Sequence, residues 1–326
     1  MPRFAILFLL SSLILSSQDS LLLVSQKASS TVGFYTWEGQ HLDAVQVGQH
    51  PHEMALSADG RFAYTTDNGT MAIEVVGEGG NTVSFIDLKE RTRVAQVSLG
   101  KYHRPHGIDV NPVTGDLLIS SENPSQLIVV DVKAKNIKRT FDTKGETSHI
   151  VTCDAKGEWA YVSNARSSNV AAIHLTTGET ILIPVGDRPE GSVLSSDGKT
   201  LYVANRESNE ITAIDTAAKK LTARIKTCRE PARVGISADD KTLIYACITD
   251  RQVGFADVAS AKQTATVDLN ARPVSLTTSP DGKHAFAGAQ DEDLVFVISI
   301  ADRKIAKQFK TIPGAGPDPI LAIRKW

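Results

Sequence analysis

A sequence repeat with a modal period of 42 residues runs along this chain and constrains its fold more than any other feature. Each copy starts at a proline or serine and holds four short runs of alternating apolar residues, separated by Gly, Asn, Asp or Pro turns. Complete copies start at the anchors Pro51, Pro105, Ser148, Pro189, Pro231 and Pro273, and a partial copy starts at Pro317. The anchor spacings are 54, 43, 41, 42, 42 and 44 residues, which indicates an array of similar structural units.

Four alternating runs per copy predict a four-stranded antiparallel sheet, and such a sheet cannot bury both of its faces alone. We therefore expect the copies to pack radially as the blades of a propeller. Residues 21–24, 32–35 and 44–47 supply three strands before the first copy, and residues 320–323 supply one strand after the last. The predicted fold is an all-β, seven-bladed β-propeller whose ring is closed by one C-terminal strand joining three N-terminal strands. Closure of this kind leaves no open sheet edge.

The N-terminal residues are typical of a secretory signal peptide. Arg3 is followed by an apolar stretch over residues 4–15 and by small residues at 16–18. We expect a signal peptide over residues 1–18, one propeller domain over residues 19–326, and a periplasmic or secreted protein. A buried strand or an uncleaved anchor is the alternative. Elsewhere no apolar run reaches the ~18 residues of a membrane span, so no transmembrane segment is expected in the mature chain.

Charge and cysteine content exclude several classes of protein. The 35 basic and 37 acidic residues give a net charge of −2, which argues against a nucleic-acid-binding protein that works through a strong basic field. Three cysteines exclude a disulfide scaffold and a four-cysteine metal site. Cys228 and Cys247 fall near one rim of the same blade, where an oxidising compartment would allow them to pair. No P-loop, dinucleotide fingerprint or nucleophile elbow occurs.

The residue after each anchor is expected to lie at the mouth of the central channel, where ligand sites of such folds gather. We call these seven positions the mouth residues: His52, His106, His149, Glu190, Ala232, Val274 and Asp318. His50 and His103 occupy neighbouring turns. Three imidazoles with one carboxylate suit a divalent transition metal, namely zinc, manganese, iron or copper. His52, His106, His149 and Glu190 are therefore the predicted ligands, while a hydrogen-bonded rim and a metal-free anion or substrate contact remain alternatives.

A second layer of polar residues is expected around this mouth. Asp67 and Glu122 end their second strands beside His52 and His106, as carboxylates that orient imidazole ligands do, or as acceptors for local turns. Arginines supply positive charge on the same face. They are Arg104, Arg166, Arg188, Arg206, Arg233 and Arg272. Guanidinium groups suit a ligand bearing a carboxylate or phosphate. Alternatively, they pair with Glu190, Glu207 and Glu230 across the rim.

The first copy is 12 residues longer than the modal period, and the surplus lies mostly within residues 68–81. This insertion carries an apolar patch followed by Gly77, Gly79 and Gly80, and it lies beside His52 and His106. Such a segment can close over the mouth as a lid. A tolerated surface insertion or a dimer contact is the alternative; the sequence does not predict an oligomeric state.

Two of the copies carry tetrapeptides that identify a family likeness. Tyr161-Val162-Ser163-Asn164 and Tyr202-Val203-Ala204-Asn205 resemble the repeat of YVTN-type β-propellers, an exported bacterial and archaeal family. The copies at Pro231 and Pro273 depart from that motif and match by spacing. The resemblance implies the fold, but its members include surface-layer proteins, binding proteins and relatives of haem- and quinone-handling propellers, so it does not select an activity.

Two functions follow as hypotheses. The first is an exported propeller that binds a small ligand, metal or protein partner at its channel mouth. The second is a metal-dependent lyase or lactone hydrolase that uses the His/His/His/Glu set, with His50 or His103 as general base. Seven-bladed lyases with a His-rich metal centre are similar in residue type. A metal-delivery protein would use the same ligands without catalysis.

Overall fold

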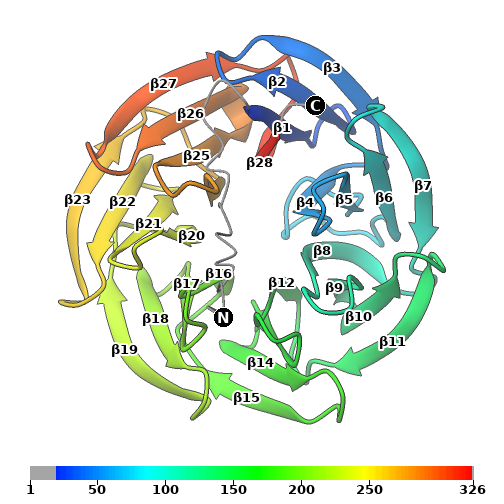
Figure 1. Ribbon diagram of the computed structural model, residues 1–326. Coiled ribbons are helices and arrows are strands. Elements are labelled where there is room, and N and C mark those ends of the chain that lie inside the picture. Colours follow the sequence, from blue (N-terminus) through cyan, green and yellow to red (C-terminus); the bar gives the residue numbers. More distant parts are fainter. Residues whose placement is uncertain (1–19, 325–326) are drawn as a thin grey trace, which may run out of the picture.

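The computed structural model describes residues 20–324 and shows seven four-stranded antiparallel sheets arranged around a central channel (Figure 1). The predicted fold class is confirmed. Ring closure is also confirmed, because β28 (Pro317–Arg324) pairs antiparallel with β1 (Ser20–Gln26). The predicted signal peptide over residues 1–18 lies outside the described residues. Within residues 20–324, no helix combines the length and apolar character that crossing a bilayer requires.

The innermost strand of each blade lines the channel and begins at or near its anchor residue (Figure 1). These strands are β4 (Pro51–Leu56), β8 (His103–Val110), β12 (Ser148–Cys153), β16 (Pro189–Leu194), β20 (Pro231–Ile236), β24 (Ser275–Thr278) and β28. Two of them depart from the predicted start. β8 begins two residues before Pro105, and β24 begins two residues after Pro273, so the anchors mark the mouth more closely than the strand boundary.

The second and third strands form the buried middle of each blade. The second strands are β1, β5 (Phe62–Asp67), β9 (Leu117–Asn123), β13 (Trp159–Asn164), β17 (Thr200–Asn205), β21 (Thr242–Cys247) and β25 (His284–Ala289). The third strands are β2 (Thr31–Thr36), β6 (Thr82–Asp87), β10 (Ser125–Asp131), β14 (Asn169–His174), β18 (Glu210–Asp215), β22 (Gln252–Asp257) and β26 (Leu294–Ser299). Both faces of these strands pack against neighbouring blades; Phe255 of β22 and Phe296 of β26 share one apolar cluster.

The fourth strands form the outer wall of the ring, and most of their residues are at least partly exposed. They are β3 (His41–Gln46), β7 (Thr92–Ser98), β11 (Asn136–Asp142), β15 (Thr180–Pro184), β19 (Lys220–Lys226), β23 (Lys262–Asp268) and β27 (Lys304–Lys310). A single 3₁₀ turn, η2 (Gln290–Glu292), follows β25 in the described part of the chain. Lysines on these strands protect outer edges from pairing with another chain.

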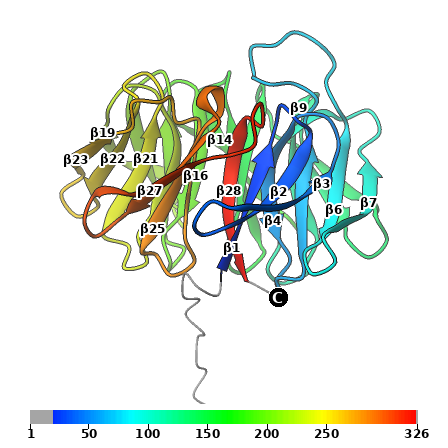
Figure 2. The ribbon, with the colours of Figure 1, turned by 90° about the horizontal axis from the view of Figure 1, so that it is seen from above.

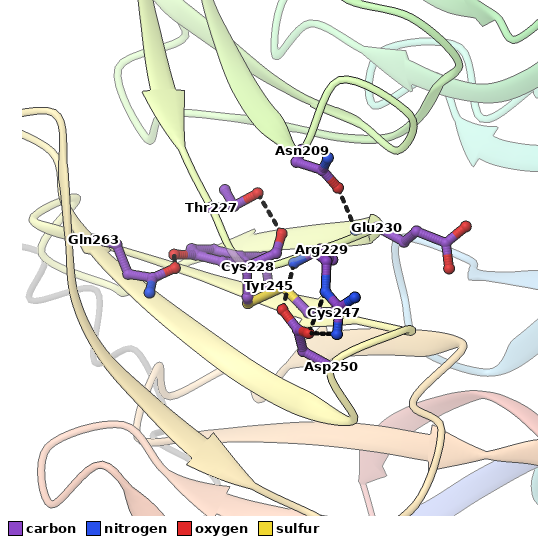
Figure 3. The surroundings of a disulfide bond; sticks show 9 residues. All are labelled: Asn209, Thr227, Cys228, Arg229, Glu230, Tyr245, Cys247, Asp250 and Gln263. Carbon is purple, nitrogen blue, oxygen red and sulfur yellow. Dashed lines mark hydrogen bonds and ion pairs between the residues drawn. A yellow bond between two sulfur atoms is a disulfide. The ribbon is translucent and has the colours of Figure 1, made fainter.

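A disulfide joins Cys228 to Cys247 in the β20–β23 blade (Figure 3). Cys228 lies in the connection before β20, and Cys247 is the last residue of β21. Both sulfur-bearing side chains are buried, and Asp250 pairs with Arg229 beside them. The bond therefore fixes the rim of this blade covalently. Cys153, on β12, is the remaining free thiol.

Candidate functional site

Each of the first five mouth residues lies where the ladder between the first and second strands is interrupted. The register breaks fall at Pro51/Met54, Pro105/Ile108, Ser148/Val151, Pro189/Ser192 and Pro231/Arg233. The residue before each anchor has a left-handed backbone, with φ of 45° at His50, 55° at Arg104, 56° at Thr147, 54° at Arg188 and 58° at Glu230. A break of this kind re-aims a side chain away from the ladder. In each of these five blades, the repeat therefore leaves one residue at the mouth outside the strand ladder.

Six of the seven mouth residues line one cavity of about 220 Å³ at the top of the channel. They are His52, His106, His149, Glu190, Val274 and Asp318. Ala232 is buried behind them, at 1% exposure. Ring geometry has therefore gathered residues spread over most of the chain into a single hollow, as the repeat spacing predicts.

The three histidines are stacked against one another. The ring centroids of His106 and His149 are 3.6 Å apart, and those of His52 and His106 are 4.5 Å apart. Gly107 allows this approach, because a Cβ atom there would lie 2.6 Å from the carbonyl oxygen of His149 and 2.7 Å from the Cα atom of Ile150. The glycine after the mouth histidine thus lets strands β8 and β12 come close together.

All three imidazoles have their Nδ1 atom next to an oxygen acceptor. His52 Nδ1 is 3.0 Å from the carbonyl oxygen of His50. The Nδ1 atoms of His106 and His149 are 2.9 and 3.2 Å from the same atom, Oε1 of Glu122. An acceptor at Nδ1 holds the proton there and leaves the lone pair on Nε2. Glu122 therefore orients two histidines at once.

The Nε2 atoms have far fewer partners. His106 Nε2 is buried and has no hydrogen-bond partner among the described residues. His149 Nε2 lies 3.9 Å from Oε2 of Glu190, too far for a hydrogen bond. Among the described residues, the group whose donor atoms lie within 4.8 Å of one another consists of His106, Glu122 and His149, and it includes neither His52 nor Glu190. Nitrogen and carboxylate donors gathered this closely, with a buried lone pair left unused, fit a transition metal.

Burial sets the charge state of this cluster. It lowers the pKa of His52 well below its usual value, with further lowering by Lys27 and His106. Burial also lowers the pKa of His106, and His149 and Arg233 add to that effect. Both imidazoles are therefore neutral at neutral pH, which is the form that binds metal. Burial works to raise the pKa of Glu122, but the hydrogen bond from His149 and the charge of Arg104 hold it below its usual value.

Glu190 lies within a cluster of guanidinium groups. Arg188 Nε donates to its Oε1 atom at 2.9 Å, Arg206 lies 3.3 Å from the same atom, and Arg233 lies 3.5 Å from Oε2. Burial would raise the pKa of Glu190, yet His149 and these three charges hold it below its usual value. Glu190 is thus an ionised carboxylate on the cavity wall, but it shares its oxygens with strong donors.

The predicted ligand-binding arginines are paired mainly with carboxylates of the protein. Arg104 Nε is 2.8 Å from Oε2 of Glu122, and Arg188 also contacts Glu74. Arg206 and Arg233 line the cavity while they hold Glu190. Arg166 is exposed and lines a separate hollow at the rim, together with Glu146 and Glu207. Three of the six arginines, Arg188, Arg206 and Arg233, thus pair with Glu190, Glu207 or Glu230 as the alternative interpretation describes, whereas Arg104 and Arg272 pair with Glu122 and Asp291.

The insertion over residues 68–81 rises above the face of the ring (Figure 2). Met71, Ala72, Ile73 and Glu74 form part of the cavity lining. Arg104 fastens the insertion by donating to the carbonyl oxygens of Ile73 at 3.0 Å and Val75 at 2.8 Å. Two side-chain contacts tie it to other blades: Glu74 pairs with Arg188, which precedes β16 three blades further along the ring, and Glu78 Oε1 lies 3.2 Å from His103 Nε2 of the adjacent blade.

Besides Arg166, three further predicted site residues lie away from this cavity, namely His50, His103 and Asp67. His50 and His103 are not among the described residues that line it. His50 Nδ1 instead contacts the carbonyl oxygen of Lys27 at 2.9 Å. Asp67 does not contact His52, since its carboxylate accepts hydrogen bonds within and beside its own blade. The donors are Gly48 N, Thr82 Oγ1, Ser84 Oγ and Gln96 Nε2.

Sequence reasoning missed Lys27, which lines the cavity beside Asp318. Lys27 follows β1, the second strand of the blade assembled from both ends of the chain. It corresponds in position to Arg206, Ile248 and Gln290, which follow the second strands β17, β21 and β25 and also line the cavity. That shared position is the sequence signal that could have found it. The repeat spacing predicts Asp318 as a mouth residue, but its pairing with Lys27 is visible only once both chain ends are placed in the same blade.

Comparison with known proteins gives one family match. Residues 64–319 match the YNCE-like beta-propellers. A stretch of 144 residues is 29% identical to Antigen Lp49 of Leptospira interrogans; it makes up 42% of this chain and 31% of that protein, so the match spans less than a third of the relative.

Solved structures share the fold at low sequence identity. The periplasmic gluconolactonase of Pseudomonas aeruginosa is 15% identical, with a TM-score of 0.75 and coverage of 94% of this chain and 99% of that one. A Desulfotomaculum acetoxidans protein gives 14% identity, a TM-score of 0.78 and the same coverage. Dihydro-heme d1 dehydrogenase NirN gives 15% identity and a TM-score of 0.66, over 99% of this chain and 75% of that one. At these identities the likeness concerns the fold alone.

Proposed function

Since the chain belongs to the YNCE-like β-propeller family, we propose that it uses the channel mouth of that fold to bind a small ligand through a divalent transition metal. One observation carries the proposal. Three buried imidazoles have each Nδ1 atom beside an oxygen acceptor, which leaves their Nε2 lone pairs for a metal. Acceptors at the distal ring nitrogen are the usual companions of metal-binding histidines.

The proposed ligands are the Nε2 atoms of His52, His106 and His149, completed by Glu190. Glu122 is assigned to positioning instead, because Arg104 and two imidazole N–H groups already occupy its oxygens. Glu190 is the weaker ligand, since three guanidinium groups compete for it. Zinc, manganese, iron and copper all accept nitrogen and carboxylate donors of this kind. When bound, the metal would supply Lewis acidity to an oxygen of the ligand.

The size of the cavity restricts what can bind there. Its volume of about 220 Å³ is below the ~300–1,000 Å³ typical of pockets for drug-sized ligands. A small organic molecule fits, whereas a haem macrocycle or a polymer does not. The apolar residues Met71 and Ile73 of the insertion cover this space and would limit the access of water.

An oxidising compartment fits both the disulfide and the N-terminal sequence. The bond between Cys228 and Cys247 would be reduced in most cytosols, so its presence supports an exported protein. We propose that ligand and metal are met outside the cytoplasm, in the periplasm or the medium.

Metal analysis of protein purified without a histidine tag tests this function. The expected result is close to one transition-metal ion per chain, lost in the variant His106→Ala. Val274→Ala is the matched control, because Val274 is a mouth residue of the same cavity that offers no ligand atom. Absence of metal from the folded wild-type protein, even after incubation with zinc, manganese, iron and copper, would contradict the proposal.

A metal-dependent lyase or lactone hydrolase at the same site is the second candidate. It is favoured by the neutral state of His52 and His106, because neutral imidazoles can hold a metal that would polarise a carbonyl or carboxylate oxygen of a substrate. Neither His50 nor His103 is favoured as the base, since neither is found in the described cavity lining. A panel of lactones, uronates and arylsulfonates, assayed with and without chelator, tests this candidate. Chelator-sensitive turnover lost in His106→Ala would support it, and no turnover by metal-loaded protein would count against it.

A further inference from the structure

A buried ion pair joins the two ends of the propeller at the wall of the cavity. Lys27 Nζ lies 3.0 Å from Oδ2 of Asp318, and the two side chains are 5% and 7% exposed. The residues are 291 positions apart, so only ring closure brings them together. Both line the hollow that contains the mouth histidines. The blade that closes the ring therefore also contributes a polar pair to the binding site.

One oxygen of this pair lacks a partner. Oδ1 of Asp318 is buried and accepts no hydrogen bond from any described residue. Leaving a buried acceptor unpaired is unfavourable, and a ligand that supplies a donor removes that penalty. Asp318 occupies the same mouth position as His52, His106 and His149, so its side chain is placed by the same repeat geometry. Among the described residues that line the cavity, His106 Nε2 and Arg206 Nε are likewise buried without a hydrogen-bond partner, but Asp318 Oδ1 is the acceptor oxygen of this set.

The pair is linked to the histidine cluster through short contacts. His52 Nδ1 contacts the carbonyl oxygen of His50 at 3.0 Å, and His50 Nδ1 contacts the carbonyl oxygen of Lys27 at 2.9 Å. Lys27 then holds Asp318. This chain of contacts fixes the ion pair relative to the imidazoles. It also gives His50 a structural role between the two halves of the site.

We propose that Asp318 recognises a hydroxyl group of the ligand, and that the ligand is a small hydroxylated carboxylic acid. This inference rests on the proposed metal-assisted binding. The carboxylate would meet the metal, and the hydroxyl would donate to Oδ1 of Asp318. A hydroxyl is favoured over an ammonium group because Lys27 already supplies the positive charge beside Asp318.

The charge of the lining supports an anionic ligand. Among the described residues, four basic and four acidic side chains line the cavity, so their formal charges cancel. A divalent metal held by the mouth histidines would leave an excess of positive charge in a largely buried space. A carboxylate ligand offsets that excess, whereas a cationic ligand would add to it.

The test compares two four-carbon acids that differ by one hydroxyl, 3-hydroxybutyrate and butyrate, as titrants of the zinc-loaded full-length protein. Calorimetry should show 3-hydroxybutyrate binding on the order of tenfold more tightly, the effect of one hydrogen bond to a charged group. In Asp318→Asn the ratio should fall below about threefold, with zinc affinity unchanged, since an amide oxygen is a weaker acceptor. Asp302→Asn, an exposed turn residue, is the matched control and should keep the wild-type ratio.

Three outcomes would overturn the inference. One is binding of neither acid to zinc-loaded protein, and another is equal binding of both. The third is a preference for the hydroxyl that survives in both Asp318→Asn and Asp318→Ala, with folding of each variant verified by circular dichroism. Zinc binding is measured separately in every variant. Failure of the wild-type protein to bind zinc would reject the proposed function itself, which distinguishes that failure from loss of hydroxyl recognition alone.

Discussion

Two parts of the ring use the same backbone position for different purposes. We call them the histidine half, which consists of the blades that begin at β4, β8 and β12, and the disulfide half, which consists of the blades that begin at β20 and β24. In the β4–β7, β8–β11 and β12–β15 blades the mouth residue is a buried histidine whose Nδ1 is held by an acceptor. In the β20–β23 and β24–β27 blades it is Ala232 or Val274, and the rim of the first of these is fixed by a disulfide. The fold determines where the mouth residue lies. Its residue type determines whether it offers a donor atom to a ligand or only packs against its neighbours.

The largest effect is expected from removing an imidazole from the histidine half. His149→Ala should weaken zinc binding by more than about a hundredfold, beyond the loss typical of outer-shell changes. His149 contacts Glu122 at 3.2 Å and lies 3.9 Å from Glu190, so its removal takes away a proposed ligand and loosens both carboxylates, although His106 still holds Glu122. Competition with a chromophoric chelator measures the affinity. A zinc affinity within tenfold of wild type would remove the functional contrast between the two halves.

Glu122→Gln tests whether the positioning carboxylate belongs to the same unit. An amide carries no charge to pair with Arg104 and is a weaker acceptor for the two Nδ1–H groups than a carboxylate, so zinc affinity should fall by about 10- to 100-fold. Glu158→Gln, an exposed glutamate, is the control and should leave affinity unchanged. A loss in Glu122→Gln as large as that in His149→Ala would instead identify Glu122 as a metal ligand.

The disulfide half should respond in stability and not in metal binding. The bond closes a separation of 19 residues, and loops of this size contribute about 3 kcal/mol to the free energy of unfolding. Cys228→Ser combined with Cys247→Ser should lower that free energy by a similar amount, as measured by urea unfolding. Zinc affinity should stay within about twofold of wild type. A large loss of zinc affinity would show that the two halves are mechanically coupled.

The smallest effect is expected from loosening the insertion. Glu74 is mostly exposed in its pair with Arg188, and pairs of this kind contribute at most about 1 kcal/mol. Glu74→Gln should therefore speed the loss of zinc to a chelator by no more than about fivefold in stopped-flow measurements. Unchanged release would indicate that the contacts of Arg104 alone hold the insertion closed.

The fold and the convergence of the mouth residues could be predicted from sequence because both follow from a fixed period. The anchors located the innermost strands to within two residues, and the residue after each anchor reached the cavity in six of seven blades. Spacing alone also placed the insertion beside the mouth. These inferences need only the repeat spacing and the closure of the blades into a ring.

Side-chain direction within a turn could not be predicted in this way. His50 and Arg104 occupy left-handed positions, so His50 turns to Lys27 and Arg104 reaches the insertion and Glu122. Asp67 is satisfied by donors of its own blade, whereas Glu122, at the corresponding strand end, faces two imidazoles. The pairing of Lys27 with Asp318 joins opposite chain ends; its counterpart in the β16–β19 blade is the pairing of Arg206 with Glu190.

The central claim is that three blades contribute one imidazole each to a single metal ion. X-ray absorption spectroscopy of the full-length protein loaded with one equivalent of zinc tests it most directly. We predict a first shell containing three imidazole nitrogens at about 2.0–2.1 Å together with oxygen. A shell with one imidazole or none, or zinc that is removed by simple dialysis, would contradict the account.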